Sequence, residues 1–192
     1  MRLDYVDNPP TNLSSEDQEV LERVKARRGA MGLIPLDLTL LHAPKIADGW
    51  NALLGAVRTK NSLPDDIREI AICRPALINS AWFEWNAHCP ILLKSQGFSE
   101  DKLDVVKQLH PKAKGALDDR QWAVLRYADA MTRDVSVPQS LFDEVKATGL
   151  NEQQMVELTA TVASYNMVSR FLVALDIGEQ NNKKPEWAIV EN

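Results

Sequence analysis

The chain has 192 residues, of which 45% are hydrophobic, and its formal net charge is -5 at pH 7. This length and apolar content are enough to bury one sizeable core, so a single compact domain is expected. The acidic balance, with a pI near 5.3, excludes the basic surface that binding to a nucleic-acid backbone requires. Small molecules or protein surfaces are therefore the expected partners.

The expected fold is all-α, with about eight helices. Apolar residues recur at spacings of three and four, and no β-branched run alternates with polar residues. Residues 1–14 are expected to form an irregular arm, since acids and prolines stand where a signal peptide would carry an apolar run. The first helix begins near Ser15, where Glu16 and Asp17 favour its positive end, and it ends at the segment "RRGAMG".

Prolines and capping residues define the next helices. A short helix is expected at residues 36–42. A longer helix is expected from Pro44 to about Lys60, because proline favours the first helical position. Ser62 is the expected N-cap of the helix in residues 63–79, "LPDDIREIAICRPALIN".

The aromatic segment "WFEWNAHCP", residues 82–90, is predicted to lie on the following helix. We expect Asn79 or Ser80 to cap this helix and Gly97 to end it. Four further N-caps are expected, the last three of which have a glutamine three residues later, as in a capping box: Ser99, Asp118, Ser136 and Asn151.

The longest apolar tract, residues 155–175, is predicted to be a buried helix rather than a membrane span. No basic loop flanks it, and three polar residues interrupt it: Glu157, Asn166 and Arg170. One helical domain is expected over residues 15–180, followed by a tail at 181–192. With neither a membrane segment nor a signal peptide expected, the predicted location is cytoplasmic.

Two residues of the aromatic helix are candidates for proton transfer. Glu84 and His88 are four residues apart, so they share a helical face that is otherwise apolar. Burial raises the pKa of a carboxyl group and a nearby imidazolium lowers it, so such a pair can donate and accept protons near neutrality. Glu69, on the preceding helix, could approach the same face as a third proton carrier. A solvated i,i+4 charged pair is the alternative interpretation.

Trp85, Asn166 and Arg170 are candidates for substrate binding. Asn166 and Arg170 are one turn apart in the apolar helix, where a buried arginine needs an acid or an anionic ligand. One interpretation of Arg170 is a clamp for a substrate carboxylate, and the other is a salt bridge to an internal acid such as Glu69 or Glu157. For Trp85 the alternative to substrate contact is core or interface packing.

No metal or cofactor is expected. The HExxH motif is missing, and only His42 and His110 remain as additional imidazoles. Phosphate-binding loops, nucleotide fingerprints and a GxSxG elbow are missing as well. Cys73 and Cys89 are too few and too far apart for a disulfide scaffold or a redox pair, so both are expected to be reduced and packed.

Three segments resemble the carboxymuconolactone decarboxylase and alkylhydroperoxidase D-like superfamily, and the likeness covers roughly residues 20–178. They are "LPDDIREIAICRPALINSAWFEWNAHCPILLKSQGFS", "LDDRQWAVLRYADAMTRDVSVPQSLFDEV" and "VELTATVASYNMVSRFLVALDIG". The resemblance implies an alkylhydroperoxidase D-like helical bundle that assembles as a homo-oligomer, a trimer or a multiple of one. Tryptophan-rich helices would suit its buried interfaces.

The peroxidase branch of that superfamily carries a CxxC pair before its histidine and a glutamate one helix earlier. Aligned on His88, Glu84 takes the place of the second cysteine and Ala81 that of the first, while Glu69 falls where the relay glutamate belongs. Without a thiolate nucleophile and a resolving thiol, the usual dithiol cycle of peroxide reduction is excluded. The resemblance is therefore to the branch that lacks CxxC.

The pattern that remains is similar to the decarboxylase branch. The resemblance implies that an acid such as a carboxylated muconolactone loses carbon dioxide, with Glu84 and His88 handling the proton delivered to the dienolate. We expect a cofactor-free lyase or isomerase that acts on a small carboxylic acid or lactone, with Glu84, His88 and Glu69 as the proton relay. Two alternatives stay open: a redox protein that uses Cys89 as a lone peroxide-reactive thiol, and a non-catalytic helical oligomer of the same fold.

Overall fold

The structure is a computed structural model, and it describes residues 1–188 of the chain. That part folds into nine α-helices and three short 3-10 helices and contains no strand, which confirms the all-α prediction. The α-helices are α1 (Ser15–Arg28), α2 (Pro35–Leu40), α3 (Pro44–Thr59), α4 (Asp65–Ile78), α5 (Trp82–Lys94), α6 (Glu100–Val106), α7 (Asp119–Arg133), α8 (Gln139–Ala147) and α9 (Glu152–Leu175). The 3-10 helices are Gly29–Met31, Ile177–Glu179 and Glu186–Ala188. Residues 189–192 of the predicted tail lie outside the described residues.

Several helix starts follow directly from their capping residues. The hydroxyl of Ser14 accepts a hydrogen bond from the Asp17 amide, and α1 begins at the next residue, as predicted. The predicted capping boxes at Asp118 and Asn151 are both formed, so α7 and α9 begin there. These caps stabilise the helices because they satisfy amide groups that have no partner within the helix.

Two predicted caps are wrong because their side chains bond elsewhere. Ser62 donates its hydroxyl to Glu157 of α9 at 2.7 Å, and Pro64 takes the N-cap position of α4. Asn79 donates its amide to Ser169 of α9 at 2.7 Å, so it cannot cap the helix that follows. Both bonds join residues about 90 positions apart, which a local sequence pattern does not reveal.

Two further boundaries differ from the prediction. The N-cap of α5 is Ala81, one residue after Ser80, whose positive φ of 54° belongs to a tight turn rather than to a cap. The N-cap of α8 is Pro138 rather than Ser136, since the fixed φ of proline matches the start of a helix.

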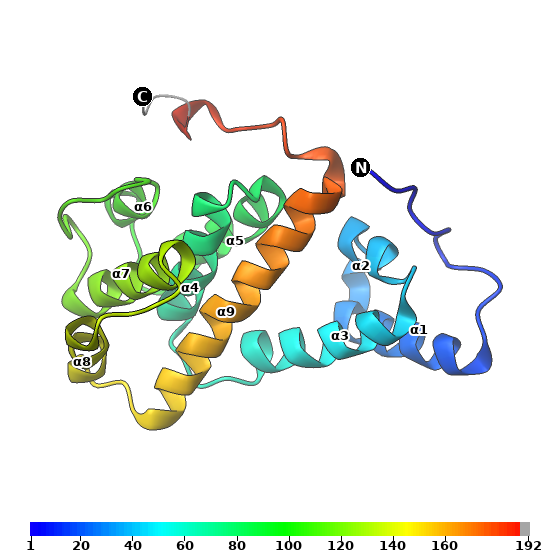
Figure 1. The fold of residues 1–192 in the computed structure, drawn as a ribbon, viewed down its shortest axis with the longest axis horizontal. Coiled ribbons are helices and arrows are strands. Elements are labelled where there is room, and N and C mark those ends of the chain that lie inside the picture. Colours follow the sequence, from blue (N-terminus) through cyan, green and yellow to red (C-terminus); the bar gives the residue numbers. More distant parts are fainter. Residues whose placement is uncertain (189–192) are drawn as a thin grey trace.

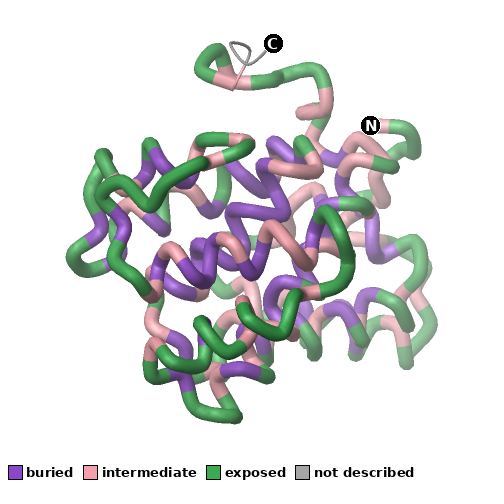
Figure 2. The backbone as a smooth tube through the Cα atoms, turned by 60° about the vertical axis from the view of Figure 1, so that its left-hand side comes forward, coloured by how far each residue is buried: buried purple, intermediate pink, exposed green. Residues whose placement is uncertain are grey.

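The helices form two groups that meet along α9, which runs obliquely across the molecule (Figure 1). On one side, α1, α2 and α3 form a layer. On the other, α4 packs against α5, α7 and α9 and is buried on nearly all sides, as expected of a central helix. Figure 2 shows the buried segments concentrated along these central helices, with the exposed ones in the loops and outer helices.

Two hydrophobic clusters correspond to the two groups of helices. One cluster contains residues of the five helices from α4 through α8, together with Met155, Leu158 and Val162 from the first half of α9. The other joins α1, α2 and α3 and includes Val168 and Leu172 from the second half of α9. Thus α9 contributes to both clusters and joins them.

The helix α9 is long and apolar enough to cross a membrane by length and composition alone. In the structure, 44% of its most apolar window is buried within the protein, and it packs against α3, α4, α5 and α7. It is therefore packed as a core helix of this fold, as the sequence predicted.

The fully buried arginine of the described chain is Arg74 on α4, and not Arg170, which the sequence predicted to be buried. Arg170 is exposed and bonds to the carbonyl and side-chain oxygens of Asn166. Arg74 donates two hydrogen bonds of 2.6 Å to Asp129 on α7. It also donates to the carbonyl of Val106 at the end of α6 and to those of Gln108 and Leu109 after it, so each part of its guanidinium is satisfied.

Candidate active site

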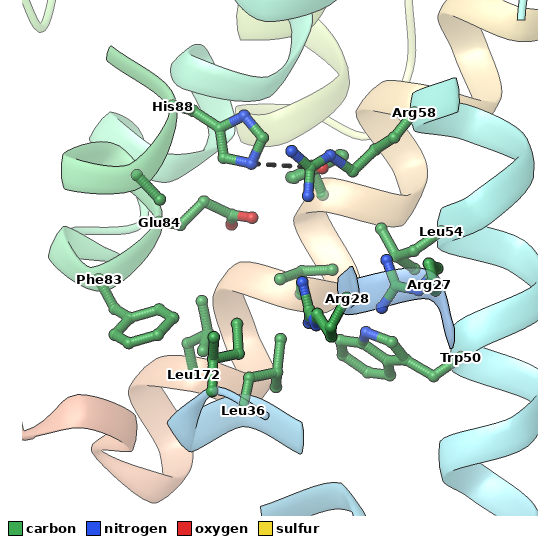
Figure 3. A pocket seen from close by; sticks show the side chains of 14 residues that line it. Arg27, Arg28, Leu36, Trp50, Leu54, Arg58, Phe83, Glu84, His88 and Leu172 are labelled. Atoms are coloured by element: carbon green, nitrogen blue, oxygen red, sulfur yellow. Dashed lines mark hydrogen bonds between the residues drawn. The ribbon is translucent and has the colours of Figure 1, made fainter. Parts of the chain in front are cut away.

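A pocket of about 70 Å³ lies between α5, α9 and the layer of α1, α2 and α3. We call it the central pocket. It has room for only a few water-sized groups beyond its mouth. Figure 3 shows that acidic, basic and aromatic side chains from these helices point into the same space.

The face of α5 that lines the central pocket carries the two residues predicted from their spacing. Glu84 and His88 are one turn apart and both line the pocket, with 4% and 5% of their surface exposed. The solvated-pair interpretation is therefore wrong. Phe83 and Ala87 extend the same wall, whereas Trp82 and Trp85 face the opposite core.

Glu69 and His88 form a buried hydrogen-bonded pair. The distance between Glu69 Oε2 and His88 Nδ1 is 2.7 Å, and Glu69 is only 2% exposed. The predicted approach of α4 to the α5 face is therefore correct. Arg68 Nε donates to the other carboxylate oxygen of Glu69 at 3.2 Å.

This pairing determines what His88 can do. A carboxylate only accepts hydrogen bonds, so Nδ1 carries the proton and Nε2 keeps its lone pair. The Nε2 atom accepts a hydrogen bond of 3.4 Å from the hydroxyl of Tyr165, which also lines the central pocket. Burial lowers the pKa of His88, although Glu69 opposes this shift, so the neutral imidazole is favoured. A neutral imidazole whose Nε2 is unprotonated can act as a general base.

Glu84 has the opposite character. Its Oε2 atom is buried and has no hydrogen-bond partner among the described residues. Burial raises the pKa of Glu84 well above its ordinary value of 4.5, and Arg58 only partly offsets the rise. Burial therefore favours the protonated form of this side chain, which can donate a proton. No hydrogen bond joins Glu84 to His88 in the structure; His88 pairs with Glu69 instead.

Three arginines form the wall opposite Glu84. Arg28 is neutralised by Asp37, to which it donates two hydrogen bonds of 2.7 Å. Arg27 donates to the amide oxygen of Asn51, and burial together with the neighbouring Arg28 and Arg58 lowers the pKa of Arg27. Arg58 lines the pocket, and the described residues provide it with no hydrogen bond or ion pair. These residues give the pocket a strongly positive side.

The structure places the three predicted substrate-binding residues away from the central pocket. Trp85 is buried in the core and stacks at 5.2 Å on Trp187. Asn166 bonds to Asn79 and Thr132, and Arg170 is bound to Asn166 on the exposed side of α9. None of the three lines the pocket that contains Glu84 and His88.

Sequence reasoning did not select several residues that line the central pocket. Arg27 and Arg58 lie on helices whose sequence pattern is typical of solvent-exposed arginines. Nothing in the sequence distinguishes them from solvated arginines. The spacing of Trp50 and Phe83 predicts that both are core residues. Tyr165 stands next to Asn166, and only the packing of α9 against α5 shows that its hydroxyl reaches His88.

The two cysteines lie outside the central pocket. Cys73 is fully buried on α4, and Cys89 is half-buried on α5 beside His88 in sequence. Burial raises the thiol pKa of both, so neither is favoured as a thiolate. Among residues 1–188 no group of three or more His, Cys, Asp or Glu side chains is arranged to hold a metal ion.

Solved structures provide the informative comparison with known proteins. No protein-family model and no curated protein matches the chain. An uncharacterized peroxidase-related protein from Silicibacter sp. is 17% identical, with 94% of each chain covered and a TM-score of 0.73. An uncharacterized peroxidase-related protein from Ralstonia eutropha, described as an alkylhydroperoxidase AhpD core, is 20% identical, covers 92% of this chain and 90% of its own, and has a TM-score of 0.72.

A third similar structure is the debrominase Bmp8 in complex with 2,3,4-tribromopyrrole. It is 17% identical, covers 91% of this chain and 92% of its own, and has a TM-score of 0.65. These identities are low, so the three likenesses concern the arrangement of helices and not the reaction.

Proposed function

We propose that this protein is a cofactor-free lyase or isomerase that acts on a small carboxylic acid or lactone. Its helices have the alkylhydroperoxidase D-like arrangement. The observation that carries this proposal is the pairing of a buried, unpartnered carboxylic acid with a neutral imidazole base in one pocket. Two titratable groups whose surroundings favour opposite proton states are typical of acid–base catalysis.

As a lyase, the site would protonate a carbanion formed by loss of carbon dioxide. The electron pair of the breaking carbon–carboxylate bond moves into a conjugated carbonyl and gives a dienolate. Glu84 donates its proton to carbon, becomes a carboxylate and regains a proton from solvent. Arg58, whose charge lowers the pKa of Glu84, stabilises the carboxylate formed in this step.

As an isomerase, the same residues would move a proton between two carbons. His88 Nε2 removes a proton next to a carbonyl, and Glu84 delivers its proton to the other end of the conjugated system. Glu69 accepts the Nδ1 hydrogen bond throughout and stabilises the imidazolium that forms. The original protonation states are then restored through solvent or by direct exchange.

The redox alternative has one observation in its favour, which is that two structurally similar proteins are described as peroxidase-related. In this chain the thiol next to His88 in sequence is Cys89, and it lies outside the central pocket with a raised pKa. A peroxide-reactive thiol needs the thiolate form. The acid–base proposal therefore takes precedence, and the non-catalytic alternative predicts no turnover at all.

The proposal is tested by carbon dioxide release and ultraviolet loss of substrate on incubation with carboxymuconolactone. We expect turnover by the wild type and a loss of at least about 100-fold in kcat for Glu84→Gln, with a comparable loss for His88→Gln. Glu100→Gln, an exposed glutamate in the first turn of α6, is the control and should match the wild type.

Two other outcomes would contradict the acid–base proposal. Release of carbon dioxide that survives both substitutions contradicts the proton-transfer assignment. No turnover of this or other unsaturated lactones and acids, combined with peroxide consumption that Cys89→Ser abolishes, would favour the redox alternative.

The proposal also includes the location, the partners and the oligomeric state of the protein. We expect a cytoplasmic protein that acts without nucleic-acid partners and assembles as a homo-oligomer, a trimer or a multiple of one. Light scattering on the eluting protein measures its molar mass. A mass equal to one chain would remove the oligomer from the proposal and leave the chemistry of the central pocket unaffected.

A further inference from the structure

The charges around the central pocket do not balance. Asp37 neutralises Arg28, and Arg68 is paired with Glu69 on the far side of His88. Arg27 has only a neutral amide partner, and Arg58 has no partner among the described residues. A guanidinium in a partly dry pocket is stabilised by an acid or by an anionic ligand.

Glu84, the one acid among the described residues that line the central pocket, does not supply the missing charge. Glu84 is buried, has an unpartnered carboxyl oxygen and favours its protonated form. A protonated acid donates a hydrogen bond instead of accepting one from a guanidinium. The pocket therefore combines two uncompensated positive groups with one hydrogen-bond donor, all directed at the same space (Figure 3).

We propose that Arg27 and Arg58 bind a carboxylate group of the substrate. Guanidinium groups recognise carboxylates through paired, charge-assisted hydrogen bonds, and two of them on adjacent helices can hold one carboxylate from two sides. This inference rests on the proposed function, because it names the class of substrate that the same pocket accepts. It assigns the carboxylate contact to α1 and α3 rather than to Arg170 on α9.

The apolar lining of the central pocket indicates which kind of carbon body the substrate carboxylate is attached to. Trp50, Leu54, Phe83 and Leu172 provide an apolar lining between the arginines and α5. Such a lining fits a short unsaturated carbon body and disfavours polar sugars or peptides. A substrate anchored by its carboxylate would place this carbon body against Glu84 and His88, where the proton transfer takes place.

The anchored carboxylate cannot be the one that leaves in a lyase reaction. Ion pairing with two guanidiniums stabilises the charged ground state, and this raises the barrier to losing the charge as carbon dioxide. A leaving carboxylate must instead lie in the apolar part of the pocket, where the loss of charge is favoured. The structure thus points to a dicarboxylate if the reaction is decarboxylation, and to a monocarboxylate if it is isomerisation.

Isothermal titration with crotonate, crotonamide and inorganic phosphate tests the proposal. Crotonate is a small unsaturated acid, crotonamide is its neutral counterpart, and phosphate reports on general binding of oxyanions. We expect the wild type to bind crotonate and not crotonamide. Arg58→Gln and Arg27→Gln should each weaken crotonate binding by about 10- to 100-fold, as expected for the loss of a charged hydrogen-bond donor.

Two further variants keep the test interpretable. Arg23→Gln, one turn before Arg27 on α1 and paired with Asp48 at the surface, is the matched control and should bind within about two-fold of the wild type. Arg58→Lys retains the charge without the planar fork and should give intermediate affinity, which separates loss of binding from loss of folding.

The outcomes distinguish this inference from the proposed function. Crotonate binding that needs both arginines but survives in Glu84→Gln and His88→Gln supports the inference even if no turnover is found. Turnover that depends on Glu84 and His88, with a KM unaffected by Arg27→Gln and Arg58→Gln, overturns the inference and leaves the function standing. Phosphate binding as tight as that of crotonate overturns the carboxylate assignment.

Discussion

At the scale of single residues, burial gives Glu84 and His88 their opposite roles. Both side chains are nearly inaccessible, and burial disfavours the charged form of each. For a carboxyl group this raises the pKa and produces an acid, whereas for an imidazole it lowers the pKa and produces a base. Glu69 moderates the effect on His88 because its carboxylate accepts the Nδ1 hydrogen bond.

The raised pKa of Glu84 predicts how Glu84→Gln changes stability with pH. The unfolded chain releases this proton near the ordinary pKa of 4.5, whereas the folded chain retains it to higher pH. The free energy of unfolding of the wild type therefore falls as pH rises above 4.5, until the folded-state pKa is passed. Glutamine does not titrate, so the variant should gain stability relative to the wild type as pH rises.

Urea unfolding at pH 4, 6 and 8 measures this difference. We expect the two proteins to be similar at pH 4 and the variant to be the more stable at pH 8. A difference that does not change with pH would show that Glu84 is ionised in the folded protein.

At the scale of secondary-structure elements, polar side chains on α4 attach it to its neighbours. Arg74 connects α4 to Asp129 of α7 and to the chain after α6, and Asn79 connects the end of α4 to α9. These contacts fix α4 to α6, α7 and α9, and α4 carries Glu69 opposite His88. The position of the base therefore depends on residues that do not touch the pocket.

Asp129→Asn tests this attachment. The substitution leaves the buried guanidinium of Arg74 without a charged partner, and we expect a loss of about 3 kcal/mol in the free energy of unfolding. Asp48→Asn, which removes the acid of the surface pair with Arg23, is the control and should cost less than about 1 kcal/mol. Equal effects in urea unfolding would contradict the role assigned to the buried pair.

At the scale of the whole molecule, the central pocket is lined by helices that are far apart in the chain, and its apolar wall belongs to the cluster of α1, α2, α3 and the second half of α9. Its walls come from α1, α2 and α3 on one side and from α5 and α9 on the other. The segment after α9 supports this arrangement, since Gly178 lies directly against the ring of Phe83 in the pocket wall. Residues that are far apart in sequence thus define the shape of the site.

Gly178→Ala tests the contact between this segment and the wall. Gly178 has a φ of +72°, and a Cβ atom there would lie 2.4 Å from Phe83 Cδ2, so the ring must move. We expect a loss of about 1–3 kcal/mol in the free energy of unfolding and weaker binding of crotonate. Gly32→Ala, with a φ of +70° and no atom within 4 Å, measures the backbone cost alone. Equal effects on binding for both variants would contradict the steric explanation.

The sequence by itself determined the features that depend on local geometry. Helical periodicity predicted the all-α fold, capping residues such as Asp118 and Asn151 marked helix starts, and the four-residue spacing placed Glu84 and His88 on one face. These features follow from hydrogen bonds and side-chain directions within a few residues, so no knowledge of the packing is required.

Only the tertiary structure decided which of these residues meet. It paired His88 with Glu69 rather than Glu84, brought Arg27 and Arg58 to the pocket, and left Arg170 at the surface. An arginine on a helix has the same local pattern whether its head lies in solvent or in a pocket. The packing of α3 and α9 decides whether such an arginine head lies in solvent or in the pocket. This packing depends on contacts between residues far apart in the chain.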